Sequence, residues 1–363
     1  MKKIAILTFL KANNYGALLQ AYALKQTLVK LGHCAQMINY HSPKYEAKVC
    51  NLSRSGFSIR WVKQILKFPA TWYRHRPFAS FENKYLQDMP PVFYDTLPSL
   101  ANKYDLFITG SDQVFNPHLT WNDDRYFLSF CTDKTKNASY AASFGFELND
   151  FTDQEKTFIQ HNLAQLQSLS VREQQGKEII QTLAPERDVQ VHLDPSLLLT
   201  KEDWKKVAKN RSHAQPYGLV YLLMGRDEAF IQYARKVAQE KNLRLLFITS
   251  HSTLARTMTG EYITPTVEEW VGLFLNAQCI FTNSFHGLAF SINFNKPFMV
   301  GSLNPAWPAA SRLNSLLNIV GLQHRKFNSN SSAFCEEEDW DAVNKKLEQE
   351  RQKAFDYLQK ITQ

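Results

Sequence analysis

Runs of apolar residues alternate along this chain with segments in which apolar residues recur at helical spacing. The first run, Lys3 to Phe9, is followed by a polar loop and then by a helical pattern from Gly16 to Leu31. Further short apolar runs, typical of buried strands, occupy residues 36–40, 106–109, 136–143, 168–172, 217–224, 243–249, 279–282 and 297–301. Helical patterns separate many of them, at residues 154–166, 227–241, 267–276 and 287–293. This alternation predicts an α/β protein with parallel sheets covered by helices on both faces.

The chain is longer than one compact core usually supports, since it has 363 residues. An Asp-Pro turn signal in "LDPSLLL" lies near mid-chain, so we predict a domain junction there and two parallel α/β domains over residues 1–190 and 191–325. Residues 336–363 carry apolar positions at helical spacing and predict one long C-terminal helix. Two such domains facing each other would form a cleft lined by the carboxyl ends of both sheets, where ligands of parallel sheets bind.

The positive charge of the chain is concentrated in one insert, at about residues 48–80. The net charge is +8, and no acidic residue lies between Glu46 and Glu82. Basic residues there alternate with aromatic ones, and apolar residues recur at helical spacing, which predicts a basic amphipathic helix. We expect residues 48–76 to contact a membrane surface or a lipid phosphate; the alternative is a solvated helical hairpin that packs on the body. No nucleic-acid-binding signature accompanies the patch, so we expect no nucleic acid partner.

Cysteine usage and hydropathy point to the cytoplasm. The five cysteines are scattered, their number is odd and no CxxC occurs, so we expect reduced thiols and no structural zinc. The apolar run after Lys2 and Lys3 is only seven residues long before Lys11, and we interpret it as a buried strand instead of a signal peptide. We therefore expect a cytoplasmic protein, peripheral at the inner face of the membrane if the insert binds there.

The stretch "TNSFHGLAFS" carries the most informative candidate site. A buried strand ends there and a helix begins near Ser284, and the first turn of a helix offers unpaired amides and partial positive charge. Ser284 can cap the helix or donate to an anion, Gly287 allows close approach, and His286 lies in the first turn. A phosphate is the natural guest of such a terminus. The alternative is a buried histidine that makes a structural hydrogen bond.

Polar residues also follow predicted strands in the first half of the chain. Arg172 ends the strand in "SVRE", and its planar fork suits a carboxylate or a phosphate; an ion pair with Glu173 is the alternative. "GSDQVFNP" places groups that could hold sugar hydroxyls at another strand end, or else forms a capping loop before a helix. "NNYGALLQ" opens the first helix but is not GxGxxG and lacks the later acid, so a dinucleotide site is not expected.

Six segments in the same order resemble the polysaccharide pyruvyl transferase family over about residues 1–325. They are "NYGALLQAYAL", "TGSDQVFNP", "YAASFG", "SVRE", "LDPSLLL" and "TNSFHGLAFSINFNKPF". The resemblance implies a glycosyltransferase B-like pair of Rossmann-type domains. It also implies transfer of pyruvate from phosphoenolpyruvate to a sugar of a cell-surface polysaccharide, or of its lipid-linked precursor, with formation of a ketal.

The resemblance also implies roles for individual residues. The family's donor-binding and acid-catalytic histidine matches His286, and its donor-binding arginine in the SVR segment matches Arg172. Some members carry an arginine two residues before the histidine, where this chain has Ser284. Arg312 and Arg226 are the candidates to supply that missing cationic contact to the donor.

The chemistry of phosphoenolpyruvate agrees with these residues. The helix terminus and Ser284 would hold the phosphate, Arg172 and Arg312 the carboxylate, and His286 would deliver a proton to the methylene carbon. Our hypothesis for the group that orients or deprotonates the acceptor hydroxyl is Asp112. We place acceptor contacts at Asn14, Tyr15, Ser111, Gln113 and Asn116. No metal and no cofactor besides the donor substrate is expected.

Two other functions are compatible with the same pattern. A nucleotide-sugar glycosyltransferase shares the fold and the phosphate site, but it needs a ribose-binding acid, and "GLAFSINFN" offers none. A sugar-phosphate-binding protein without catalysis would keep the fold, and the serine at position 284 is the feature compatible with it.

Overall fold

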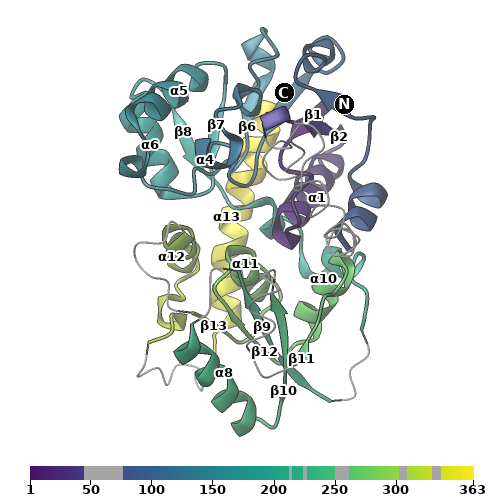
Figure 1. Cartoon of the computed structure of the whole chain (residues 1–363), viewed down its shortest axis with the longest axis vertical. Helices are drawn as coiled ribbons and strands as arrows, with labels where there is room; N and C mark the ends of the chain where they lie inside the picture. Colours follow the sequence, from purple (N-terminus) through teal and green to yellow (C-terminus); the bar gives the residue numbers. More distant parts are fainter. Residues whose placement is uncertain (45–76, 212–214, 224–226, 250–260, 302–308, 329–336) are drawn as a thin grey trace, which may run out of the picture. The chain divides into compact units, whose positions relative to one another are not determined.

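The computed structural model describes residues 1–44, 77–211, 215–223, 227–249, 261–301, 309–328 and 337–363 (Figure 1). The chain forms two compact units. One comprises Met1–Pro195 together with Phe355–Gln363, and the other comprises Ser196–Ala354. The predicted basic helix of residues 48–76 and the predicted donor contact Arg226 lie outside the described residues.

The first unit is built on parallel strands. Its main sheet has the order β2-β1-β5-β6, with bounds Cys34–Met37, Lys3–Leu7, Leu106–Thr109 and Asn137–Ser139. Strands β7 (Leu169–Val171) and β8 (Val189–Val191) pair in parallel, and single bridges Ala138↔Ser168 and Ala142↔Val171 connect them to β6 and the loop after it. All carboxyl ends therefore meet at one edge. A separate parallel pair joins β3 (Tyr40–His41) to β4 (Val92–Phe93).

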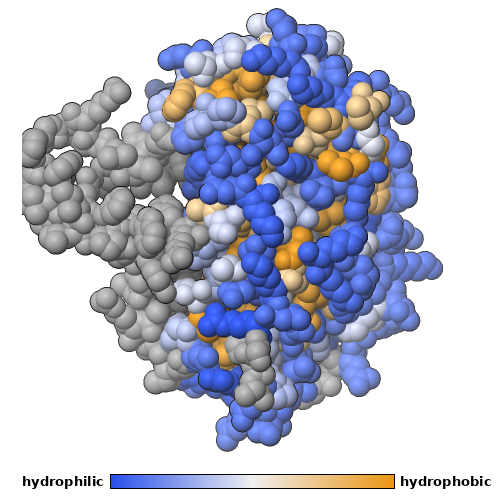
Figure 2. Space-filling view, turned by 90° about the vertical axis from the view of Figure 1, so that its right-hand side faces the viewer, coloured by the Kyte–Doolittle hydropathy of each residue, from blue (hydrophilic) through white to orange (hydrophobic). Residues whose placement is uncertain are grey.

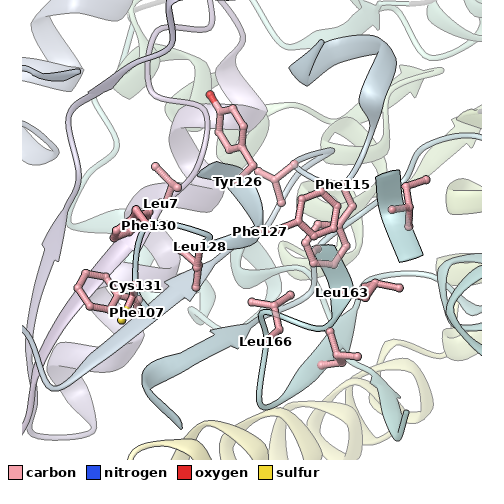
Figure 3. Packing of buried hydrophobic residues seen from close by; sticks show 14 of the residues in the cluster. Leu7, Phe107, Phe115, Tyr126, Phe127, Leu128, Phe130, Cys131, Leu163 and Leu166 are labelled. Carbon is pink, nitrogen blue, oxygen red and sulfur yellow. The ribbon is translucent and has the colours of Figure 1, made fainter. Parts of the chain in front are cut away.

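The helices of this unit begin at capping residues close to those expected. Helix α1 (Tyr15–Lys30) contacts β2, while α5 (Asp153–Leu163) and α6 (Gln174–Leu183) pack on each other, and α6 also packs on β7 and β8. The short α4 is Pro117–Thr120, and a helical segment covers 77–85. Aromatic side chains fill the core between these elements (Figure 3); the rings of Phe115 and Phe127 stack at 4.6 Å.

Over its described residues, the second unit has one five-stranded sheet in which every pair is parallel. Its order is β11-β10-β9-β12-β13, with bounds Glu261–Tyr262, Arg244–Thr249, Tyr217–Leu222, Cys279–Thr282 and Phe298–Val300. The helices among the described residues include α7 (Lys201–Lys205), α8 (Glu228–Glu240), α10 (Val267–Asn276), α11 (Phe285–Asn293), α12 (Ala309–Val320) and α13 (Trp340–Ile361). The last residues of α13, from Phe355, belong to the first unit.

The predicted α/β class with two parallel sheets is confirmed. Several element ends differ, and the sequence did not predict β4, β8, β11, α6 or α12. The strand expected at 136–143 pairs regularly only over Asn137–Ser139, because the chain beyond it makes isolated bridges. The last helix begins at Trp340, four residues later than expected. In the described residues no helix is long and apolar enough to cross a membrane. The face shown in Figure 2 carries hydrophobic areas interrupted by hydrophilic residues.

Candidate functional site

A buried polar cluster lies at the carboxyl edge of the first unit's sheet. Arg172 and Glu173 directly follow β7, Asp194 follows β8, and Asp112 follows β5 after the Gly110–Ser111 turn. Because the parallel strands all end at this edge, three loops that are distant in sequence meet there.

The guanidinium of Arg172 is surrounded by carboxylates. Its Nη1 donates to Asp194 Oδ2 at 2.7 Å, while Asp112 Oδ1 and Glu173 Oε2 each lie 3.8 Å from other guanidinium nitrogens. The side chains of Arg172, Glu173 and Asp194 are at most 2% exposed. Burial by itself lowers the pKa of a guanidinium, but the three carboxylates outweigh burial and raise the pKa of Arg172. The group therefore stays charged.

Asp112 is the member of this cluster that reaches the surface. Its side chain is 16% exposed, against 1% for that of Arg172. Its backbone is left-handed, with φ of 67°, a conformation that aspartate tolerates better than most residues. Its carboxylate accepts from the amide of Gln113 at 2.9 Å, and its carbonyl accepts from the amide of Ser143 at 2.9 Å. The loop is therefore held on both sides of the carboxylate.

A second set of buried groups supports the cluster. The hydroxyl of Ser111 lies 3.0 Å from Asp194 Oδ2 and 2.9 Å from the carbonyl of Ala141. The amide of Ser111 donates to Gln20 Oε1 at 3.1 Å, and Gln20 donates in turn to the hydroxyl of Thr8 at 3.1 Å. Sequence reasoning did not single out Gln20 or Asp194, although both lie in the quoted segments "NYGALLQ" and "LDP".

Glu173 is held by the loop after β6. The hydroxyl of Ser143 donates to Glu173 Oε1 at 2.8 Å, and the amide of Phe144 donates to the same oxygen at 3.2 Å. The segment "YAASFG" thus fixes the carboxylate next to Arg172, a role that its sequence did not indicate.

The side chains expected to contact the acceptor have partners within the unit. Asn14 caps α1 by accepting from the amides of Gly16 and Ala17, and Asn116 caps α4 by accepting from the amide of His118. Asn116 also donates to Gln113 Oε1 at 2.9 Å. Tyr15 is 8% exposed, and the centroid of its ring lies 4.8 Å from that of Phe78. Acceptor contact by Asn14, Tyr15, Ser111, Gln113 and Asn116 stays a prediction.

The second candidate site begins where β12 gives way to α11. Ser284 caps the helix: its hydroxyl accepts from the amide of Gly287 at 3.3 Å, and its own amide donates to the hydroxyl of Thr282 at 3.1 Å. Asn283 accepts from the amide of Leu223 at 2.8 Å, which ties the ends of β12 and β9 together. The predicted strand end and helix start at Ser284 are confirmed.

His286 is the second residue of α11 and is 7% exposed. Its ring meets that of Phe285 edge-on at 5.3 Å. It lies at the carboxyl edge of a parallel sheet and in the first turn of a nine-residue helix, where the unpaired amides give partial positive charge. A phosphate bound at this terminus would lie beside the imidazole.

Packing explains why position 287 is glycine. A Cβ there would overlap the hydroxyl of Thr282 and would lie 3.1 Å from Cδ1 of Tyr221. The absence of a side chain at Gly287 therefore allows α11 to pack closely on its own sheet. Arg312, the other candidate donor contact, is half-buried on α12, which packs against α11. Donor contact by Gly287, Arg312 and Arg172 stays a prediction.

Comparisons with known proteins place the chain in a wider context. The sequence profile described as polysaccharide pyruvyl transferase matches residues 14–301. Among curated proteins, none matches the chain. Similar solved structures include the UDP-GlcNAc 2-epimerase from Neisseria meningitidis bound to UDP-GlcNAc, at 10% identity and a TM-score of 0.49 over 98% of this chain and 94% of that one.

Two further solved structures are similar to the chain. The spinosyn rhamnosyltransferase SpnG has 12% identity and a TM-score of 0.49 over 100% of both chains. The wall teichoic acid polymerase TagF has 10% identity and a TM-score of 0.46 over 98% of this chain and 83% of that one.

Proposed function

The chain belongs to the polysaccharide pyruvyl transferase family, and we propose that it transfers pyruvate from phosphoenolpyruvate to a sugar of a cell-surface polysaccharide or of its lipid-linked precursor. The product is a pyruvate ketal, and the other product is inorganic phosphate. The observation that supports this proposal most is His286, buried in the first turn of α11 behind the Ser284 cap.

The donor site is assigned to this helix terminus. The phosphate of phosphoenolpyruvate would accept from the first-turn amides, and the hydroxyl of Ser284, which accepts from the amide of Gly287, keeps its own proton to donate. A phosphate carries enough negative charge for the helix dipole to contribute to its binding. Arg172 and Arg312 are the predicted contacts for the carboxylate, and Arg226 is the other candidate for the missing cationic contact to the donor.

Proton transfer to carbon is the step that needs His286. The charged imidazole donates its proton to the methylene carbon, which becomes a methyl group and leaves oxocarbenium character at the central carbon. An acceptor hydroxyl attacks that carbon and loses its proton to a base. The carbon–oxygen bond to phosphate then breaks, and a neighbouring hydroxyl closes the ketal and loses a second proton.

Asp112 is the proposed base for the first of these hydroxyl protons. Its carboxylate is the exposed member of the Arg172 cluster, and the amide of Gln113 fixes one of its oxygens. A carboxylate can accept a hydrogen bond from a sugar hydroxyl and then take the proton as the carbon–oxygen bond forms.

A thermal-shift titration tests the donor assignment. Wild type, His286→Ala and His161→Ala are each titrated with phosphoenolpyruvate, UDP-sugars and inorganic phosphate; His161 is an exposed histidine of α5 and serves as the matched control. A ligand at 100 times its Kd adds about 2.7 kcal/mol to the free energy of unfolding. We expect a shift with phosphoenolpyruvate that is reduced in His286→Ala only.

Other outcomes assign other functions. A shift with a UDP-sugar and none with phosphoenolpyruvate would make the protein a nucleotide-sugar glycosyltransferase, with His286 at a diphosphate. Binding of phosphoenolpyruvate without any formation of acid-labile pyruvate on envelope polysaccharide would make it a binding protein.

A further inference from the structure

Gln113 lies between the candidate base Asp112 and the cap of a short helix. Its backbone amide donates to Asp112 Oδ1 at 2.9 Å, and its side-chain oxygen Oε1 accepts from Asn116 Nδ2 at 2.9 Å. Asn116 is 0% exposed, and its own Oδ1 accepts from the amide of His118 at the start of α4. The side chain of Gln113 is therefore held through its oxygen.

These hydrogen bonds decide which end of the Gln113 side chain faces a ligand. A backbone N–H can only donate, so the Asn116 atom that meets the His118 amide must be the oxygen. The other end of the Asn116 side chain is then the donor Nδ2, and Gln113 must present its oxygen to it. In the part of the chain that the structure describes, the remaining NH2 group of Gln113 makes no hydrogen bond and is open to solvent.

The loop after β6 leaves room for this side chain. Gly145 has a left-handed backbone with φ of 71°, and a Cβ there would lie 1.9 Å from Gln113 Oε1 and 2.5 Å from its Cδ. Two residues earlier in the same loop, the amide of Ser143 donates to the carbonyl of Asp112 at 2.9 Å. Asp112 and Gln113 therefore lie against the same short loop.

We propose that Asp112 and Gln113 together bind two neighbouring oxygens of the acceptor sugar, and that Asn116 is the positioning residue that turns the Gln113 NH2 group outward. The inference rests on the proposed function, in which Asp112 takes the proton of the attacking hydroxyl and a neighbouring hydroxyl closes the ketal. An ionised carboxylate only accepts hydrogen bonds, whereas an NH2 group only donates them. The two residues therefore offer different partners to the two hydroxyls.

The arrangement gives each hydroxyl of the pair one role. The first hydroxyl donates to the carboxylate of Asp112. The oxygen of the second accepts from Gln113 Nε2 with one lone pair and keeps the other for attack on the central carbon. A sugar without the second oxygen would leave the NH2 group unpaired in the complex, so the acceptor class is a sugar with two neighbouring free hydroxyls.

Two substitutions replace the outward NH2 group by an oxygen and keep a hydrogen bond between positions 113 and 116. In Gln113→Glu, one carboxylate oxygen still accepts from Asn116 and the other faces outward. In Asn116→Asp, one oxygen still caps α4, and Gln113 turns its amide to donate to the new carboxylate, which brings Oε1 outward. A purely structural role of this hydrogen bond would leave both variants like wild type.

The experiment measures acceptor and donor binding separately on the full chain. Glycan extracted from source cells that lack this protein is supplied with phosphoenolpyruvate, and initial rates of formation of acid-labile pyruvate give KM and kcat for the glycan. Calorimetry gives the Kd for phosphoenolpyruvate. In both variants we expect the KM for the glycan to rise about fivefold or more, while the Kd for phosphoenolpyruvate stays within about twofold of wild type.

Gln36→Glu is the matched control, because it makes the same exchange on β2. Gln36 Oε1 accepts from the hydroxyl of Tyr104 at 2.9 Å, a hydrogen bond that glutamate keeps. The KM of this control should equal that of wild type, and the urea midpoints of Gln113→Glu and Asn116→Asp should stay close to that of wild type.

Three results would overturn the proposal. They are a wild-type KM in either variant, an equal rise of KM in the Gln36→Glu control, and a Kd for phosphoenolpyruvate weakened about tenfold in Gln113→Glu, which would place this side chain at the donor. If wild type transfers no pyruvate to the extracted glycan, the proposed function fails first, and this inference fails with it.

Discussion

Arg172 and Asp194 form a buried ion pair, with Nη1 2.7 Å from Oδ2 and side chains 1% and 0% exposed. The two residues come from consecutive loops at the carboxyl edge of the same sheet, one after β7 and one after β8. Asp194 also lies within hydrogen-bond distance of the hydroxyl of Ser111, and the guanidinium of Arg172 lies 3.8 Å from Asp112. A change in this pair should therefore affect both the stability of the first unit and the candidate acceptor site.

Removing either charge of this ion pair should destabilise the protein, and removing the arginine should cost more than removing the aspartate. Arg172→Met leaves three carboxylates without their cation, and we expect a loss of about 3–5 kcal/mol in the free energy of unfolding. Asp194→Asn leaves the guanidinium with Asp112 and Glu173 and removes one charged hydrogen bond, so we expect about 1.5–3 kcal/mol. Urea denaturation measures both. Equal losses, or a larger loss for Asp194→Asn, would contradict the predicted charge balance.

The Ser284 cap should matter for stability and for donor binding separately. Ser284→Ala removes the acceptor for the Gly287 amide and should cost about 1 kcal/mol. Thr266→Ala removes a comparable cap, which accepts from the amide of Glu269 on α10, at a similar cost. Only Ser284→Ala should weaken phosphoenolpyruvate binding, by up to about tenfold, because it alone deletes a proposed donor to the phosphate. Calorimetry that finds equal affinities would remove Ser284 from the site.

Two helical glycines should respond differently to substitution by alanine. Gly287→Ala places a Cβ against Thr282 and Tyr221 on the adjacent strands, and we expect a loss of about 1–3 kcal/mol from overpacking. In Gly176→Ala, on α6, the nearest atom is Val171 Cβ at 3.3 Å, and the better helix propensity of alanine, about 1 kcal/mol, offsets that tight contact. Thermal unfolding should show a clear decrease in Tm for the first variant and little change for the second.

Lys296 should make stability depend on pH in the alkaline range. Burial, with a smaller contribution from the nearby Lys201, lowers the pKa of Lys296 to about 8 from the ordinary 10.5. Between these values the unfolded chain binds more protons than the folded one, so the contribution of Lys296 to stability rises with pH from about 8 to 10. Below pH 8 its penalty is constant.

The comparison with Lys296→Met isolates this effect. Urea midpoints are measured from pH 7 to pH 10, and above pH 8 the midpoint of wild type should rise relative to that of Lys296→Met. The midpoint of Lys345→Met, a substitution at an exposed position of α13, should follow that of wild type throughout. A constant difference between wild type and Lys296→Met would mean that the lysine keeps an ordinary pKa in the folded protein.

The sequence of the basic insert predicts that residues 48–76 bind a membrane surface. Charge reversal at Arg60, Lys63 and Lys67 should abolish flotation with vesicles that contain anionic lipid, because each basic residue near such a surface contributes about 1 kcal/mol. The control is a reversal of three exposed lysines elsewhere, Lys205, Lys206 and Lys345. Binding that survives the first reversal would exclude residues 48–76 as the docking segment.

The sequence by itself determined the features that depend on neighbours along the chain. The spacing of apolar residues predicted the α/β class and the strand before Ser284. The capping residue predicted the start of the helix after it, because a cap bonds to an amide only three residues away. Six ordered segments were sufficient to identify the family. Element ends were less certain, as the short strand at Asn137–Ser139 shows, because pairing partners decide where a strand stops.

Only the tertiary structure decided which loops meet and what each side chain touches there. Arg172 pairs with a carboxylate 22 residues away, and the amide of Ser111 bonds to Gln20 across 91 residues. The order of strands in the sheet sets these distances, and apolar periodicity along the chain contains no information about that order. For the same reason the sequence indicated an arginine suited to an anion, whereas the folded chain surrounds that arginine with three carboxylates.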